Sequence, residues 1–154
     1  MNNQVLISKL FKMSFKVKKG KTKIIEVPWT TGTTTSKDGL VCWSVGYGIP
    51  CTSSTTSGAT IGVAVSAVTS ATDIYTTQGN LKVRVPMDKN VEWEAAVTAT
   101  LVVADLGLHC DLTDQNTISR ASGTLDIVQI SKFISTTKCW CKLNIGTGAV
   151  AGSL

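Results

Sequence analysis

The sequence predicts a small, mainly β protein, an antiparallel β-barrel or sandwich with an extended N-terminal arm. Short stretches of alternating apolar and polar residues, separated by turn-forming residues, recur between positions 81 and 144. Residues 28–80 contain 13 Thr, 7 Ser and 7 Gly, a composition that favours strands and turns over helices. Charged residues make up only 16% of the chain, against a typical ~25%. The predicted surface is therefore polar but largely uncharged.

The predicted arm, residues 1–27, carries most of the positive charge. Positions 1–25 hold seven lysines and no acid, whereas the other 129 residues hold eight basic and ten acidic side chains, a net charge of −2. We expect a short helix over 3–13 and then an alternating strand with a turn at Gly20-Lys21, ended by Pro28. Such an arm suits an acidic protein surface, nucleic acid or a membrane surface. The lysines assigned to docking are Lys9, Lys12, Lys16, Lys18, Lys19, Lys21 and Lys23.

A β domain is expected over residues 28–145, in two parts. In the Thr/Ser/Gly-rich part, 28–80, the apolar residues at 40–45 and 60–68 indicate strands, with a loop at 46–58. The small Ala and Gly residues of the second strand indicate close packing against another surface, and another chain is one candidate for it.

The second part, residues 81–145, predicts five strands. They are expected at 81–85, 91–103, 110–112, 125–134 and 138–145, with a turn at 105–107 and a polar loop at 114–123. Five short strands joined by turns are typical of a small barrel or sandwich. Residues 146–154 form a Gly/Ala-rich tail.

No arrangement of residues predicts catalysis or a cofactor. His109 is the one histidine, and Cys110 beside it faces the opposite side of a strand, so the two cannot act together. Cys139 and Cys141 share one strand face, but paired zinc-ligand spacings are missing. We therefore predict a protein that is not an enzyme and has no catalytic residues, metal or cofactor. The five cysteines are expected to be free thiols.

Two further features concern partners. Four tryptophans are many for a chain of this size, and Trp43 and Trp140 are candidates to anchor an interface. No apolar stretch approaches the ~20 residues of a membrane-spanning helix, so we expect no membrane partner.

Several short motifs carry a resemblance. Asp105 and Gly107 form a turn, Asp111-Leu112 follows as a strand, and Lys132–Ser135 with Thr137-Lys138 makes a hairpin. Over about residues 81–144 this pattern resembles small tailed-phage proteins that decorate or reinforce the capsid. The resemblance implies a virion structural protein, assembled in the host cytoplasm, that binds the major capsid protein and copies of itself.

Two alternatives stay open. A five-stranded OB-like or SH3-like barrel could bind nucleic acid, although the chain has only Arg84 and Arg120 to supplement its lysines. The other alternative is a virion protein located at the head–tail junction or in a fibre. Direct binding to DNA would separate the first from capsid decoration.

Overall fold

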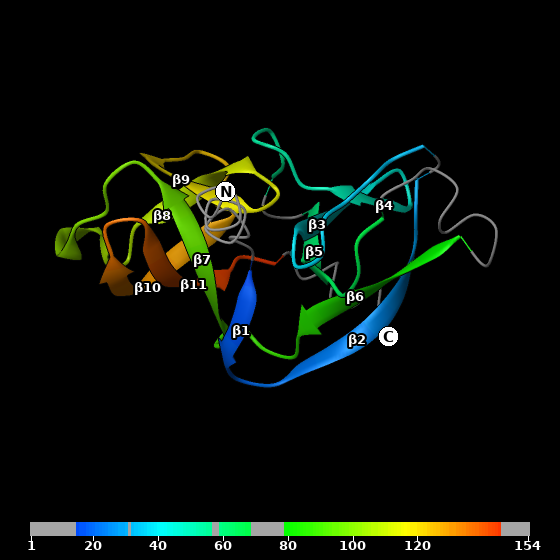
Figure 1. The fold of residues 1–154 in the computed structure, drawn as a ribbon, viewed down its shortest axis with the longest axis horizontal. Helices are drawn as coiled ribbons and strands as arrows, with labels where there is room; N and C mark the ends of the chain where they lie inside the picture. The colour runs from blue at the N-terminus through cyan, green and yellow to red at the C-terminus, as the bar shows by residue number, and fades with distance from the viewer. Residues whose placement is uncertain (1–14, 31, 57–58, 69–78, 146–154) are drawn as a thin grey trace, which may run out of the picture.

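The computed structural model describes residues 15–30, 32–56, 59–68 and 79–145, and the statements below concern these residues. They form two β-sheets that lie one after the other along the longest axis (Figure 1). The predicted mainly β fold with a small barrel is confirmed. Residues 1–14 of the predicted arm, with the expected helix, and the tail 146–154 lie outside the described residues. No helix in the described ranges is long and apolar enough to cross a membrane.

The first sheet closes into a barrel of five strands, with a sixth strand at its edge. Its order is β1-β7-β11-β10-β8-β9, and a parallel pairing of β7 with β9 closes it. One edge of β7 is shared, because β1 pairs with residues 92–94 and β9 with residues 96–98. The strands are β1 (Lys16–Lys19), β7 (Glu92–Thr98), β8 (His109–Asp114), β9 (Thr117–Ser122), β10 (Val128–Ser135) and β11 (Lys138–Leu143), and the short 3-10 helix η2 covers Val103–Asp105.

The second sheet has the order β2-β6-β5-β3-β4. Its two edge strands approach each other, because an isolated parallel bridge joins Trp29 to Gly48. Glycine is required there, since a Cβ on Gly48 would lie 2.8 Å from a side-chain carbon of Val27. The strands are β2 (Thr22–Pro28), β3 (Leu40–Ser44), β4 (Tyr47–Pro50), β5 (Thr60–Ala64) and β6 (Asn80–Pro86).

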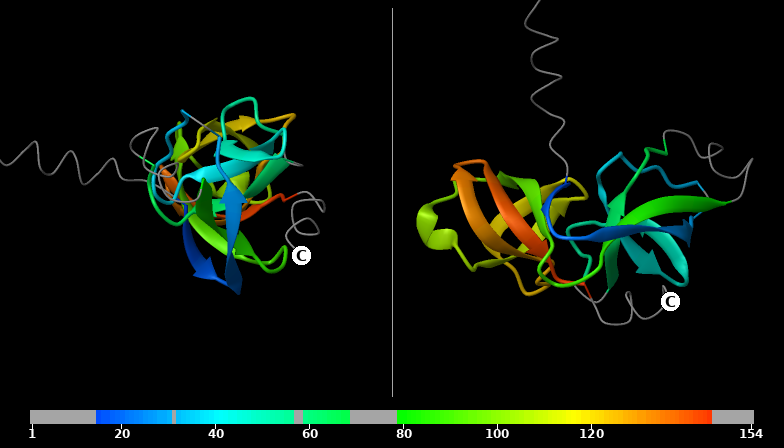
Figure 2. Two further views of the ribbon diagram at one scale, coloured as in Figure 1. Left: turned by 90° about the vertical axis from the view of Figure 1, so that its right-hand side faces the viewer. Right: turned by 90° about the horizontal axis from the view of Figure 1, so that it is seen from below.

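The protein has two hydrophobic cores, and strands of the second sheet contribute residues to both. The larger core fills the barrel around Trp93, and the smaller surrounds Trp29. β3 serves both, because Leu40 packs into the barrel core and Val41 into the other; every residue of β5 is buried. The second sheet therefore covers one end of the barrel as well as enclosing a core of its own (Figure 2).

A two-stranded ribbon joins the two sheets. Residues 16–28 run antiparallel to residues 80–94, first as β1 against β7 and then as β2 against β6. The ribbon bends at Gly20, whose φ of +94° suits glycine and whose Cβ would lie 2.9 Å from Val91. The Gly20-Lys21 turn predicted from the sequence is this bend. Figure 1 shows the ribbon continuing from β1 and β7 in the barrel to β2 and β6 in the second sheet.

Four expectations need correction. The loop expected at 46–58 contains β4, which pairs with β3 as a hairpin. The barrel does have five strands within residues 81–145, but β6, predicted as one of them, belongs to the second sheet. The fifth is β9, which lies inside the predicted polar loop at 114–123; its polar residues conceal one buried side chain, Ile118. The close packing expected around residues 60–68 is made within the chain, since a Cβ on Gly62 would lie 2.3 Å from the carbonyl oxygen of Arg84.

Candidate docking surface

The outer face of the barrel brings together side chains from distant parts of the sequence in two cross-strand rows. Cysteine and tryptophan side chains at alternate positions of β7 and β11 point into the barrel, so the residues between them point outward. The rows follow from the strand registers. The first is Lys19, Glu92, Lys142, Gln129 and His109, and the second is Lys16, Glu94, Trp140 and Lys132.

We call these two rows, together with Lys18 and Lys138, the lysine–tryptophan face. It carries six lysines against two glutamates, a formal charge of +4. Glu94 pairs with Lys18 at 3.5 Å and with Lys138 at 3.7 Å, and Glu92 pairs with Lys19 at 3.8 Å. Both acids are therefore already partnered within the chain, and the face keeps a surplus of positive charge.

Trp140 lies near the centre of this face. The ammonium group of Lys132 sits 4.4 Å from the centre of the Trp140 ring, within cation–π range. Cys139 and Cys141 on either side are completely buried, as the alternation predicted. Trp140 is half-buried, so part of an aromatic surface ringed by lysines is open to solvent.

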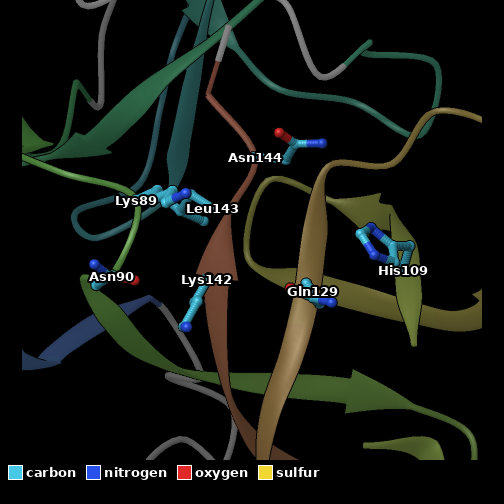
Figure 3. A pocket seen from close by; sticks show the side chains of 7 residues that line it. All are labelled: Lys89, Asn90, His109, Gln129, Lys142, Leu143 and Asn144. Atoms are coloured by element: carbon cyan, nitrogen blue, oxygen red, sulfur yellow. The ribbon is translucent and has the colours of Figure 1, made fainter. Parts of the chain in front are cut away.

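A hollow of about 320 Å³ lies at one end of the face. Seven residues line it: Lys89, Asn90, His109, Gln129, Lys142, Leu143 and Asn144. Figure 3 shows Gln129 and His109 on neighbouring strands at one side and Asn90, from the connection between β6 and β7, at the other. The lining contains two lysines and no acidic residue, so the hollow is a polar, cationic extension of the face.

The imidazole of His109 is held in place by Asp126. Nδ1 of the ring contacts a carboxylate oxygen of Asp126, and because a carboxylate can only accept, Nδ1 carries the proton. Asn144 Nδ2 donates to the other carboxylate oxygen at 2.9 Å and to the backbone carbonyl of Asp126 at 3.1 Å. Asp126 itself has a φ of +53°, and its N–H donates to Asp111 at 2.9 Å.

The motif residues behind the resemblance have structural roles in this fold. Arg120 on β9 donates two hydrogen bonds to Asp105, at 2.9 and 3.2 Å, which tie η2 to the barrel. The hydrogen bonds from Arg120 lower the pKa of the Asp105 carboxyl. Gly107 takes a φ of +85°, and one oxygen of Asp111 accepts from the N–H groups of Leu125 and Asp126.

The buried cysteines form no centre for chemistry on this face. Cys110, Cys139 and Cys141 lie in the barrel core, while His109 faces outward. In the described part of the chain, no three His, Cys, Asp or Glu side chains are placed to hold a metal ion together. Burial raises the pKa of Cys110 to about 12, so this thiol is protonated and unsuited to act as a nucleophile.

The structure separates the residues predicted for docking. Lys16, Lys18, Lys19 and Trp140 share the face. Lys21 is exposed at the ribbon bend, Lys23 lies on β2, and Trp43 is half-buried against the smaller core. Lys9 and Lys12 lie outside the described residues. Sequence analysis missed Lys132, Lys138 and Lys142, although the spacing of two residues that places Lys138, Trp140 and Lys142 on one strand face was visible.

The chain matches no protein-family model and no curated protein.

Proposed function

We propose that the protein is a non-enzymatic virion structural protein that binds the capsid lattice as a decoration or reinforcing subunit, docking through the lysine–tryptophan face. The observation that carries this proposal is the pair of cross-strand rows, which join β1 lysines to Trp140 and to lysines of β10 and β11. The resemblance of residues 81–144 to tailed-phage capsid proteins supports the choice of partner.

The chemistry of the face fits an acidic partner surface. Lysines at a rim speed association and select the partner, while a half-buried aromatic side chain supplies contact area when it becomes covered. A lattice presents the same acidic patch many times, and copies that also contact one another multiply a weak single contact through effective concentration. This combination needs no catalytic group.

A purely protective role for the lysines does not explain the arrangement. Lysine on an exposed edge strand prevents unwanted pairing with other strands, and this would account for Lys16 and Lys19 on β1. Lys142, however, lies on β11 at a position that is paired on both sides, with Gln129 of β10 and with Glu92 of β7. Edge protection does not account for this lysine, which supports a function of the face itself.

Co-sedimentation of the purified protein with empty capsids tests the proposal. The double variant Lys132→Glu, Lys142→Glu should bind at least about tenfold more weakly, because it reverses two charges on the face (~1.4 kcal/mol or more). The matched control is Lys37→Glu, Lys82→Glu, which makes the same charge change at exposed positions off the face. Equal loss in both variants, or none in either, would contradict docking through this face.

Deleting residues 1–14 is a further useful variant. It removes Lys9 and Lys12 but keeps β1, whereas a deletion to residue 23 would also remove the strand that pairs with β7. If full binding survives this deletion, docking is assigned to the face rather than to the first lysines.

Binding to nucleic acid is the second candidate, because a basic surface with a partly exposed aromatic ring can stack bases and hold phosphates. Sedimentation with bare single- and double-stranded DNA decides between the two. Binding to DNA without binding to capsids would replace the decoration proposal. Copy number per particle separates decoration, which needs many copies, from a head–tail junction, which needs a single ring.

A further inference from the structure

The hollow at the end of the lysine–tryptophan face has features that docking does not require. Its lining converges from four separate segments: the β6–β7 connection, β8, β10 and the end of β11. Every charged side chain of the lining is a base. We propose that this hollow is a binding site for one oxyanion group, a carboxylate or a phosphate, held by Lys89, Lys142 and His109.

Lys142 keeps its charge available for such a ligand. The acid opposite it in the cross-strand row is Glu92. Glu92 already accepts a hydrogen bond from the Ser131 hydroxyl at 2.5 Å and pairs with Lys19 at 3.8 Å. Within the described residues, no acid lies within 4.0 Å of the Lys142 ammonium, so an anion from outside would meet little competition.

His109 leaves one ring nitrogen for a ligand. Its Nδ1 is occupied by Asp126, and the described part of the chain offers no hydrogen-bond partner to Nε2. Nε2 is therefore the ring nitrogen that can hydrogen-bond a ligand at the side of the hollow.

Asp126, which contacts the His109 ring, is itself fixed by hydrogen bonds. It adopts a left-handed backbone with a φ of +53°, a conformation that aspartate accepts more readily than most side chains. Three hydrogen bonds hold it: one from its own N–H to Asp111, and two from Asn144. The His109 ring is therefore oriented at the side of the hollow by the chain itself.

The ligand class follows from the donors. Two ammonium groups provide N–H donors and positive charge, and the carboxamides of Asn90 and Gln129 add donors that can rotate toward the ligand. Such a set recognises an oxyanion by charge and hydrogen bonds, with no apolar pocket for a larger group. Lysine and histidine also bind phosphate well as point charges.

Titration of the ¹⁵N-labelled full-length protein with sodium phosphate and, separately, with sodium acetate tests the site, with sodium chloride at equal ionic strength as the reference. We expect saturable shifts in the His109 ring signals and in the amides of residues 89–90 and 142–144. Stronger binding of phosphate would assign the site to a phosphate group, and stronger binding of acetate would assign it to a carboxylate.

Variants make the assignment to this hollow specific. Lys142→Met and His109→Gln should each lower the affinity for the more tightly bound anion about fivefold, the size expected for loss of one partly exposed polar contact. Lys82→Met, at an exposed position on β6, should change this affinity less than twofold. The proposal is overturned if neither anion gives shifts beyond those of chloride, or if Lys82→Met weakens binding as much as Lys142→Met. This test uses no capsids, so its failure would leave the proposed docking function untouched.

Discussion

The two sheets bury their strands differently. In the barrel, β7 and β11 bury one face and expose the other, so their outer residues form continuous charged rows. In the second sheet, β5 is buried throughout and β3 contributes to both cores. A strand covered on both faces has no surface left to present a ligand or partner. β5 therefore presents no surface to a partner, whereas the outer residues of β7 and β11 form the candidate docking surface.

The largest expected effect tests whether the two sheets are one folding unit. Trp93→Ala should destabilise the protein by about 3–5 kcal/mol, because Trp93 is completely buried in the barrel core. Leu40, Cys42 and Val63 of the second sheet pack in that same core, so we expect both sheets to unfold in one transition. Urea unfolding followed by far-UV circular dichroism and by tryptophan fluorescence measures this.

Leu81→Ala is the matched variant in the smaller core, with an expected loss of about 2–5 kcal/mol. This variant should shift the midpoint of the same single unfolding transition to a lower urea concentration. If either variant produced two separate transitions, the sheets would be independent units and the shared core would not couple them.

The next effect concerns close packing within the second sheet. Gly62→Ala should cost about 1–3 kcal/mol, because the new Cβ would overlap the carbonyl oxygen of Arg84 on β6. Gly46→Asn is the control: Gly46 has a φ of +85°, which asparagine tolerates, and open space around its Cα. A thermal melt that shows the same shift for both variants would argue against the tight β5–β6 contact.

The thiols of the two sheets should differ in reactivity. A hydrogen bond from Cys51 lowers the pKa of Cys42, in the second sheet, to about 7, whereas burial raises the pKa of Cys110 to about 12 and also raises that of Cys141. Alkylation with iodoacetamide at pH 8, mapped by mass spectrometry, should therefore modify Cys42 before the barrel cysteines. Faster modification of Cys110 or Cys141 would contradict the difference in thiol pKa between them and Cys42.

The barrel thiols also give the stability a pH dependence. Above about pH 9 the thiol of Cys110 ionises in the unfolded chain but stays protonated in the folded one. The unfolded state then binds fewer protons, so the free energy of unfolding should fall as the pH rises from 9 towards 12. Cys110→Ala should reduce this slope in urea titrations at pH 8 and 10. An unchanged slope would exclude Cys110 as its source.

The smallest effect is expected on the exposed face of the barrel. Glu94→Gln removes the ion pairs with Lys18 and Lys138 but should change stability by less than about 1 kcal/mol, because both lysines are well exposed. The same change raises the charge of the face and should strengthen capsid binding in the sedimentation assay. A large loss of stability would mean that the ion pairs serve the fold rather than docking.

Alternation predicted much of the fold, and the exceptions have local causes. β6, β7 and β11 were found because each places apolar residues at every second position. β9 was missed because Thr, Ser and Arg dominate it and Ile118 is the single buried side chain among its described residues. The assignment of β6 to the barrel failed because alternation gives a strand no indication of which sheet it joins.

The candidate docking surface was predictable only in part. Lysines of β1 and Trp140 were singled out, but the register that sets Lys16, Glu94, Trp140 and Lys132 in one row depends on contacts between residues far apart in the sequence. A bulge between Ile130 and Lys132 interrupts the alternation of β10, which hides the outward position of Lys132. The hollow brings together four segments, and no local pattern could indicate it.

The ribbon also bears on how the architecture could have arisen. The chain leaves the barrel at Lys21 and returns at Met87, whose N–H donates to the Lys21 carbonyl at 3.0 Å. Residues 22–86 are thus a loop excursion whose two ends touch, which is the geometry of a domain inserted into a pre-existing one. Leu40 and Val63 of this segment close one end of the barrel core. A shortened chain that joined Lys21 to Met87 would keep the barrel's strand pairings. The core residues at the end of the barrel that Leu40 and Val63 now cover would then be exposed to water.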